Sequence, residues 1–255
     1  MERHRSMGPE GLPQKIDAVR IAAYISSGCA LFKKNSAGFV GFTSILVFLY
    51  FVGSVIGILI AGPLNSGFFI VVFKLLRHRE TTFDDFFRGF RNRNYLSLSL
   101  IGLVNYLPLF LIGSLALRIP IGVKVLLLLP GIYLAVAYTF ALPLVLEKKI
   151  NFWYAMERSR KLISKNWFAF FALFIVLILI NLIGPLLVVI GFFSLMFSGL
   201  GGVGNTSAAI PTLVLTLGCM FLGLVVLLVT IPFSFCAIAA AYADIVGLPP
   251  VAANV

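Results

Sequence analysis

Long apolar stretches alternate with short charged segments along this chain. Between residues 36 and 246 the apolar stretches carry almost no ionisable side chains. A helix of about 20 such residues crosses the hydrocarbon core of a bilayer, where a charge costs several kcal/mol. The pattern predicts an all-α integral membrane protein of about six transmembrane helices, at about Ala37–Ile60, Pro63–Leu76, Tyr95–Leu117, Val125–Leu146, Trp167–Phe197 and Pro211–Val246.

Prolines inside these stretches predict irregular helices. Proline has no backbone N–H to donate, and its ring crowds the carbonyl one turn earlier. The second stretch is short for a full crossing, and the last is too long for one straight crossing at about 1.5 Å per residue. We therefore predict helix breaks at Pro63, Pro130, Pro185 and Pro232.

The charges predict an orientation. Of the 20 Lys and Arg residues, only Arg118 and Lys124 lie outside residues 1–34, Lys74–Arg93 and Glu147–Lys165. Cytoplasmic loops of membrane proteins carry an excess of Lys and Arg. A cytoplasmic N-terminus places all three segments, and all nine acidic residues, inside. This predicts a multi-pass protein of the cytoplasmic (inner) membrane with both termini in the cytoplasm.

One junction occurs three times. A short helix ends in a basic residue followed by Asn at Lys34-Asn35, Arg93-Asn94 and Lys165-Asn166, each time before an odd-numbered stretch. The second and third of these helices are amphipathic, as in helices that lie in the headgroup plane. The pattern predicts three repeats of an amphipathic interfacial helix plus a transmembrane hairpin; the alternative is ordinary anchoring at basic junctions. The predicted single transmembrane domain is 15–248, with units of about 15–80, 81–149 and 150–248 between a polar N-terminal tail, 1–14, and a C-terminal tail, 249–255.

Local signals refine two of these short helices. Thr82 and Asp85 have the spacing of a capping box. Asp84 and Arg88 have the i, i+4 spacing of an ion pair on a helix. Asn151 suits the N-cap of the third helix, whose apolar face consists of Phe152, Ala155, Met156, Ser159, Leu162 and Ile163.

Composition agrees with a membrane protein and limits the partners. The chain is 60% hydrophobic and 11% charged, with a mean hydropathy of +1.06, whereas soluble domains carry roughly 25% charged residues. The net charge of +11 is better explained by anionic lipid headgroups than by nucleic acid. The predicted partners are the phospholipid bilayer and its anionic lipids, and no nucleic acid; a membrane-protein partner or a homo-oligomer stays open.

Candidate chemistry is sparse. His4 and His78 have no neighbours spaced as metal ligands, and no nucleophile motif or Gly-rich phosphate loop occurs. Adjacent Asp84 and Asp85 would point about 100° apart on a helix, which does not suit paired acid–base catalysis. We therefore predict no catalytic residue, no metal site and no cofactor, and a protein that is not an enzyme. Asp244 is expected to pair with a Lys or Arg rather than to relay protons.

Three segments carry a resemblance to a known family. They are residues 83–90 (FDDFFRGF), 127–143 (LLLPGIYLAVAYTFALP) and 155–167 (AMERSRKLISKNW), together with the closing Ile231-Pro232 and residues 241–244 (AYAD). The chain resembles, over roughly residues 15–248, prokaryotic multi-pass membrane proteins of unknown function that are related to the membrane domain of glycerophosphodiester phosphodiesterases. The resemblance implies a six-helix membrane protein and supplies no mechanism.

The basic short helices are the best functional candidates. Each Lys or Arg near an anionic leaflet contributes about 1 kcal/mol to membrane attraction. We predict a non-enzymatic protein that organises anionic lipid or partner proteins through these helices. The alternatives are a transporter or channel for a small or lipidic solute, without a titratable mid-membrane site, and an integral subunit of a larger membrane complex. The predicted headgroup contacts are Lys33, Lys34, Arg88, Arg91, Arg93, Arg158, Arg160, Lys161 and Lys165.

Overall fold

The computed structural model describes residues 20–52, 54–114, 120–201 and 206–248, and helices are the only regular secondary structure within these ranges. The tails predicted at 1–14 and 249–255 lie outside them, as does Arg118. The helices are α1 (Ile21–Lys34), α2 (Ser36–Val52), α3 (Ser54–Leu76), the 3₁₀ helix η1 (Phe83–Phe87), α4 (Tyr95–Ser114), α5 (Ile121–Ala137), α6 (Ala141–Lys148), α7 (Phe152–Ser164), α8 (Trp167–Gly201) and α9 (Thr206–Ile245).

Three segments of the described chain are long and apolar enough to span a membrane. They are Pro130–Lys148, Trp167–Met196 and Pro211–Ile245. The apolar segments Ser36–Tyr50, Ile60–Leu76 and Tyr95–Tyr106 are shorter. The prediction of an all-α protein is thus confirmed, together with the coarser prediction of helices that are long and apolar enough to span a membrane. The expected division of the first hairpin near residue 61 is wrong, because α2 ends at Val52 and α3 begins at Ser54.

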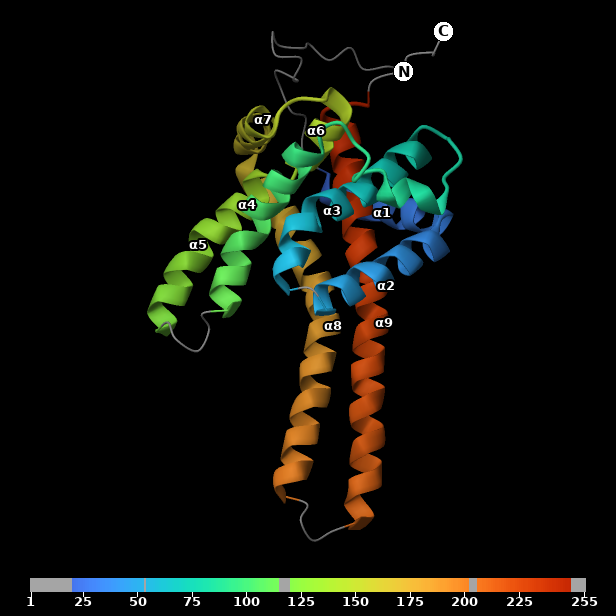
Figure 1. Ribbon diagram of the computed structural model, residues 1–255, viewed down its shortest axis with the longest axis vertical. Coiled ribbons are helices and arrows are strands. Elements are labelled where there is room, and N and C mark those ends of the chain that lie inside the picture. Colours follow the sequence, from blue (N-terminus) through green and yellow to red (C-terminus); the bar gives the residue numbers. More distant parts are fainter. Residues whose placement is uncertain (1–19, 53, 115–119, 202–205, 249–255) are drawn as a thin grey trace.

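Helices α8 and α9 form a long antiparallel hairpin, the arm, which extends well beyond the other helices (Figure 1). Close approach of the two helices depends on glycine: a Cβ on Gly223 would lie 2.7 Å from the Gly184 carbonyl oxygen. Polar side chains also bond across the arm, where Asn181 Nδ2 donates to Ser234 Oγ at 2.6 Å. The outward faces of the arm are apolar and exposed, as expected for a surface that meets lipid.

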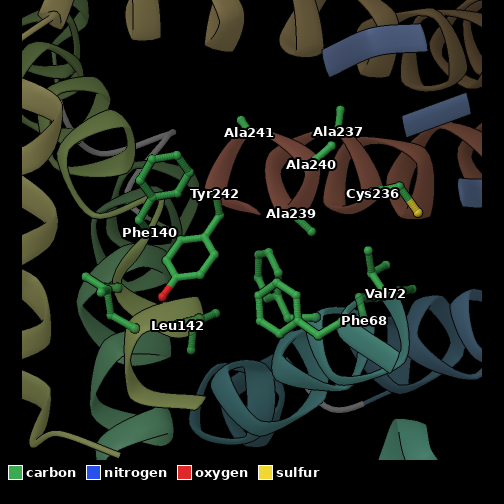
Figure 2. Packing of buried hydrophobic residues seen from close by; sticks show 14 of the residues in the cluster. Phe68, Val72, Phe140, Leu142, Cys236, Ala237, Ala239, Ala240, Ala241 and Tyr242 are labelled. Carbon is green, nitrogen blue, oxygen red and sulfur yellow. The ribbon is translucent and has the colours of Figure 1, made fainter. Parts of the chain in front are cut away.

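The other helices gather around the opposite end of the arm. Small side chains on different sides of α9 are buried where α1 and α3 pack against it; they are Ala237, Ala239, Ala240 and Ala241 (Figure 2). Gly28 of α1 sits against Ala237 so closely that a Cβ would lie 2.9 Å from the backbone. Arg20 and Tyr24 both bond Asp244, at 3.1 Å and 2.9 Å, which joins the start of α1 to the end of α9. The predicted pairing of Asp244 with a basic residue is confirmed.

Stacked phenylalanines hold η1 against α2 and α3. Phe86 of η1 is fully buried, and its ring stacks on Phe42 of α2 at 4.6 Å between centroids. Phe68 of α3 contacts both rings and stacks on Phe235 of α9, also at 4.6 Å. Offset or edge-to-face aromatic pairs contribute about 0.5–1.5 kcal/mol beyond their buried area. The short segment between α3 and α4 is therefore fixed in place by its own phenylalanines.

The predicted break at Pro130 is wrong in position. Helix α5 continues through Pro130, and the interruption falls at residues 138–140, before α6. Pro143 is compatible with this break, because it lies in the first turn of α6, where a backbone N–H has no partner within the helix. Ser159 of α7 fills the gap: its Oγ accepts from the Phe140 N–H at 3.2 Å and donates to the Ala137 carbonyl at 2.7 Å.

The other predicted breaks are also wrong. Pro63, Pro185 and Pro232 all lie inside continuous helices, α3, α8 and α9. A single proline removes one hydrogen bond, whereas a full break would expose several backbone groups to an apolar environment. Retaining the helix is therefore the less costly arrangement.

Candidate functional site

A cavity of about 500 Å³ opens at the end of the molecule where the charged residues gather. It lies between the last turns of α3, the segment that joins α3 to α4, and the end of α6. Five basic and two acidic residues contribute to its wall, and we call it the basic cavity. Its lining residues are Ile70, Phe73, Lys74, Arg77, Arg79, Asp84, Arg88, Arg91, Asn92, Leu146 and Glu147.

One face of α3 builds the inner wall. Ile70, Phe73, Lys74 and Arg77 follow the i, i+3, i+4, i+7 spacing that places residues on the same side of a helix. The apolar pair comes first and the basic pair comes last, at the helix end. The wall is consequently apolar on its deeper side and positive at its rim.

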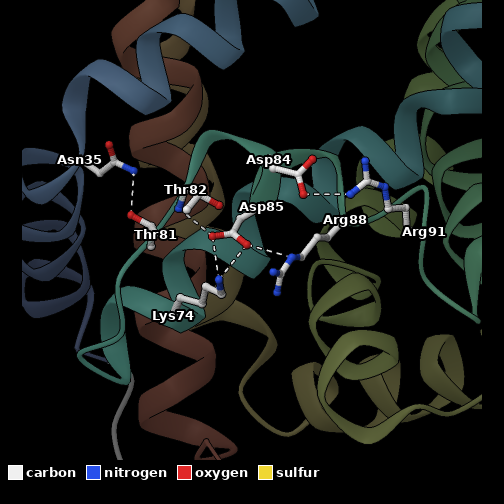
Figure 3. A network of polar contacts seen from close by, with 8 residues as sticks. All are labelled: Asn35, Lys74, Thr81, Thr82, Asp84, Asp85, Arg88 and Arg91. Atoms are coloured by element: carbon white, nitrogen blue, oxygen red, sulfur yellow. Dashed lines mark hydrogen bonds and ion pairs between the residues drawn. The ribbon is translucent and has the colours of Figure 1, made fainter.

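The buried carboxylate of Asp85 holds two basic side chains of the cavity rim in place (Figure 3). Asp85 is fully buried, and Lys74 Nζ lies 2.7 Å from both of its carboxylate oxygens. The Thr82 N–H donates to the same carboxylate at 2.8 Å, and Arg88 Nε lies 2.9 Å away. Burial alone would raise the pKa of Asp85, but the bonds from Lys74 and Thr82 outweigh it and hold that pKa below its usual value.

Two predictions concern the segment that contains Asp85, and the structure confirms one of them. The predicted capping box of Thr82 and Asp85 is present. The predicted pair of Asp84 with Arg88 is wrong, because η1 is a five-residue 3₁₀ helix and lacks the i, i+4 register of an α-helix. Asp84 instead pairs with Arg91 at 2.9 Å, while Arg88 pairs with Asp85.

A second ion pair closes the far side of the basic cavity. Arg77, one residue beyond the end of α3, bonds Glu147 in the last turn of α6. The Glu147 side chain is only 8% exposed, so this pair is partly withdrawn from solvent. The two helices that flank the basic cavity are thereby joined.

The structure brings together only part of the predicted headgroup set. Arg88 and Arg91 line the basic cavity, whereas the exposed Arg93 follows them in the chain without lining it. Lys33 and Lys34 are exposed in the last turn of α1. The remaining four lie on or just after α7, which Figure 1 shows on the opposite side of the charged end; they are Arg158, Arg160, Lys161 and Lys165.

Helix α7 is amphipathic as predicted. Ala155, Met156, Ser159, Leu162 and Ile163 are buried. Asn151 occupies the predicted N-cap position, although its side chain makes no capping hydrogen bond. On the outer face the Arg160 guanidinium donates two hydrogen bonds to Glu157 at 2.8 and 2.9 Å, so part of the positive charge on α7 is already paired.

Sequence reasoning missed four charged residues of the basic cavity. Lys74, Arg77, Arg79 and Glu147 were recognised as part of charged segments but not as members of a site. The i, i+3 spacing of Lys74 and Arg77 at the end of an apolar helix was the available signal. Glu147 lies 70 residues away from Arg77, and no local pattern connects them.

Nothing among the described residues forms a group of three or more His, Cys, Asp or Glu side chains that could hold a metal ion. His78 is exposed, with a left-handed backbone conformation at φ 53° in the turn after α3. The five basic side chains that line the basic cavity have the chemistry that suits anions, since guanidinium and ammonium groups bind phosphate and carboxylate oxygens.

Comparisons of the chain with protein-family models, with curated proteins and with solved structures find no match.

Proposed function

We propose that this protein is a non-enzymatic, multi-pass protein of the cytoplasmic membrane that binds anionic lipid headgroups at its basic cavity. The single observation that carries the proposal is the convergence of five basic side chains around a cavity of about 500 Å³ at the end of apolar helices. Basic pockets at the cytoplasmic ends of membrane helices suit phosphate headgroups.

The placement in the membrane is part of the proposal. All three basic–Asn junctions directly precede a long helix, since Asn35, Asn94 and Asn166 come immediately before α2, α4 and α8. The pair of Arg20 with Asp244 keeps the start of α1 and the end of α9 together. These features support three units of short helix plus hairpin, although the second short helix, η1, ends at Phe87 and not at Arg93 as predicted. The gathering of basic residues at the charged end supports a cytoplasmic location for it.

The length of the arm supports a membrane-crossing role for it. At about 1.5 Å per residue, α8 and α9 are about 52 Å and 60 Å long. That exceeds the roughly 40–45 Å of a bilayer with its headgroups. We propose that the arm crosses the whole membrane at a tilt, while the shorter hairpins occupy its cytoplasmic part.

The transport alternative gains no support from the small apolar cavity beside the α5–α6 break. The apolar cavity between the α5–α6 break, α8 and α9 has a volume of about 10 Å³, which is the size of a single water. Its wall is apolar apart from Thr139, and includes Phe140, Phe170 and Leu177. A solute path would need more room and more polar groups at this depth.

Lipid selectivity in mixed micelles tests the proposal. The purified protein, in a neutral detergent, is offered equal amounts of phosphatidylglycerol and phosphatidylcholine with identical acyl chains, and bound lipids are counted by native mass spectrometry. We expect phosphatidylglycerol to predominate and its excess to fall as salt is raised, because exposed charges are screened.

A matched pair of variants locates the effect. Arg79→Ala combined with Arg91→Ala removes two cations of the basic cavity, and each is expected to weaken anionic lipid binding about fivefold. Arg93→Ala removes an exposed cation of the same segment outside the cavity and is expected to change binding little. Equal binding of the two lipids by the unmodified protein would overturn the proposal.

A further inference from the structure

We infer that the basic cavity selects a phosphate monoester dianion carried on a lipid, in preference to the phosphodiester headgroups of ordinary anionic lipids. The inference rests on the proposed function and specifies the ligand class of the same site. It is argued from the charge excess, the donors and the shape of the cavity.

The charges lining the basic cavity do not cancel. Five basic and two acidic residues line it, and the buried Asp85 carboxylate contacts Lys74 and Arg88 from behind. The wall therefore retains an excess of two positive charges. A phosphate monoester carries about −1.5 to −2 charges near neutral pH, which matches this excess, whereas a phosphodiester carries one.

Two arginines are held in a way that suits a phosphate group. Arg88 uses Nε for Asp85 and Arg91 uses Nη1 for Asp84. Each contact fixes one side of a planar guanidinium and leaves other N–H donors for a ligand. Phosphate oxygens accept paired hydrogen bonds from such a fork, and a monoester offers three terminal oxygens where a diester offers two.

The apolar wall favours a lipid over free phosphate. Ile70, Phe73 and Leu146 line the cavity beside the cations and belong to the apolar helices α3 and α6. The volume, about 500 Å³, is in the range of pockets for whole small molecules, roughly 300–1,000 Å³, and exceeds the need of one phosphate. A glycerol backbone and the first methylenes of acyl chains would fill the apolar side.

Competition between lipids of equal chain length tests the inference. At pH 8, where a phosphate monoester is a dianion, the full-length protein in neutral detergent is offered phosphatidate, phosphatidylglycerol and phosphatidylcholine, and bound lipids are counted by native mass spectrometry. We expect phosphatidate to bind about tenfold more tightly than phosphatidylglycerol. Inorganic phosphate and glycerol 3-phosphate, added at the same concentration as the lipid, should not displace it.

Substitutions of cavity arginines test whether the preference for phosphatidate arises at the basic cavity. Arg79→Gln with Arg91→Gln should reduce the preference for phosphatidate over phosphatidylglycerol to about twofold or less, while Arg93→Gln should preserve it. The thermal unfolding midpoint of each variant is measured in parallel to show that it is folded. The lipid preference of the unmodified protein is measured without any variant, so it tests the inference even if a variant fails to fold.

The outcomes separate the inference from the function on which it rests. Equal binding of phosphatidate and phosphatidylglycerol, both above phosphatidylcholine, overturns the inference and leaves the proposed function intact. Equal binding of all three lipids overturns both. Displacement of phosphatidate by inorganic phosphate overturns the assignment to a lipid, and retention of the preference in the Arg79/Arg91 variant overturns the assignment to this cavity.

Discussion

Lys74 at the end of α3 donates to both carboxylate oxygens of Asp85, at 2.7 Å each, although Asp85 is fully buried. The contact joins a long apolar helix to the short segment that follows it. Removing one member of a buried ion pair leaves an uncompensated charge and typically costs about 3–5 kcal/mol. The pair therefore holds the basic cavity in shape.

We expect Asp85→Asn to destabilise the protein by about 3 kcal/mol, because Lys74 and Arg88 lose their shared carboxylate. The measurement is the thermal unfolding midpoint in detergent. Asp84→Asn is the control: its exposed pair with Arg91 should contribute less than about 1 kcal/mol. Equal destabilisation by the two variants would show that burial of Asp85 is unimportant.

The depressed pKa of Asp85 gives stability a defined pH dependence. Its folded-state pKa lies below the unfolded value, about 3.9. The stability it contributes is therefore fully present above that unfolded value and is lost as pH falls through the folded pKa. Unfolding midpoints of the unmodified protein and of Asp85→Asn should differ at pH 6 and converge in strong acid. A constant difference across the range would contradict this assignment.

Ser159→Ala should weaken the α5–α6 junction. The Ser159 hydroxyl bonds two backbone groups at the break, the Phe140 N–H and the Ala137 carbonyl, and leaving buried groups unsatisfied costs about 1–3 kcal/mol. Ser164→Ala, an exposed position at the end of the same helix, is the matched control and should be nearly neutral. Thermal unfolding of the two variants provides the comparison; a neutral Ser159→Ala would mean that water replaces the hydroxyl.

Helices α3 and α4 cross at glycine, so alanine should not be tolerated there. A Cβ on Gly62 would lie 1.8 Å from the Leu98 carbonyl oxygen, and one on Gly102 would lie 2.4 Å from the Gly62 nitrogen. Either substitution forces the helices apart, and we expect a large loss of folded protein on size-exclusion chromatography. Gly122→Ala meets nothing within 4 Å and should behave normally.

Cysteine labelling tests the proposed crossings. In a background without the three native cysteines, single replacements at Ser54, His78 and Gly122 are exposed to a membrane-impermeant maleimide. With the charged end inside and the shorter hairpins in the cytoplasmic part of the membrane, His78→Cys should react only after permeabilisation, and Ser54→Cys and Gly122→Cys should not react in intact cells. Labelling of either hairpin position in intact cells would instead indicate six full crossings. Labelling of His78→Cys in intact cells would reverse the orientation. A Ser54→Cys protein that reacts from neither side would support the proposed α2–α3 hairpin, which enters the membrane without crossing it.

Periodicity predicted those features that depend on a few adjacent residues. The apolar face of α7 is buried as its spacing indicates, and the Thr82–Asp85 capping box follows from two residues three apart. The boundary between the first two apolar helices was misplaced, because α3 continues through Pro63 and its start at Ser54 has no strong local signal. A proline shows that a helix loses one backbone hydrogen bond at that residue. It does not show how strongly the packing of the neighbouring residues keeps the helix continuous.

The set of residues that lines the basic cavity, and the ion pairs among them, depend on contacts between residues far apart in the sequence. The charged segment Lys74–Arg93 is plain in the sequence, yet the pairing of Asp84 with Arg91 follows from the 3₁₀ form of η1. That form is fixed by Phe86, whose ring is buried among phenylalanines of α2 and α3. Local spacing predicted Arg88 as the partner of Asp84, but in the packed structure Asp84 pairs with Arg91.

The sequence by itself determined that this is an all-helical protein with segments long and apolar enough to span a membrane, because a bilayer excludes charge and the chain keeps its charges out of long apolar stretches. Only the tertiary structure decided which charges share a site. Arg77 and Glu147 meet across 70 residues of chain, and Ser159 of α7 reaches the break between α5 and α6. Such contacts depend on how the helices cross at small residues, and that geometry is a property of all the side chains together.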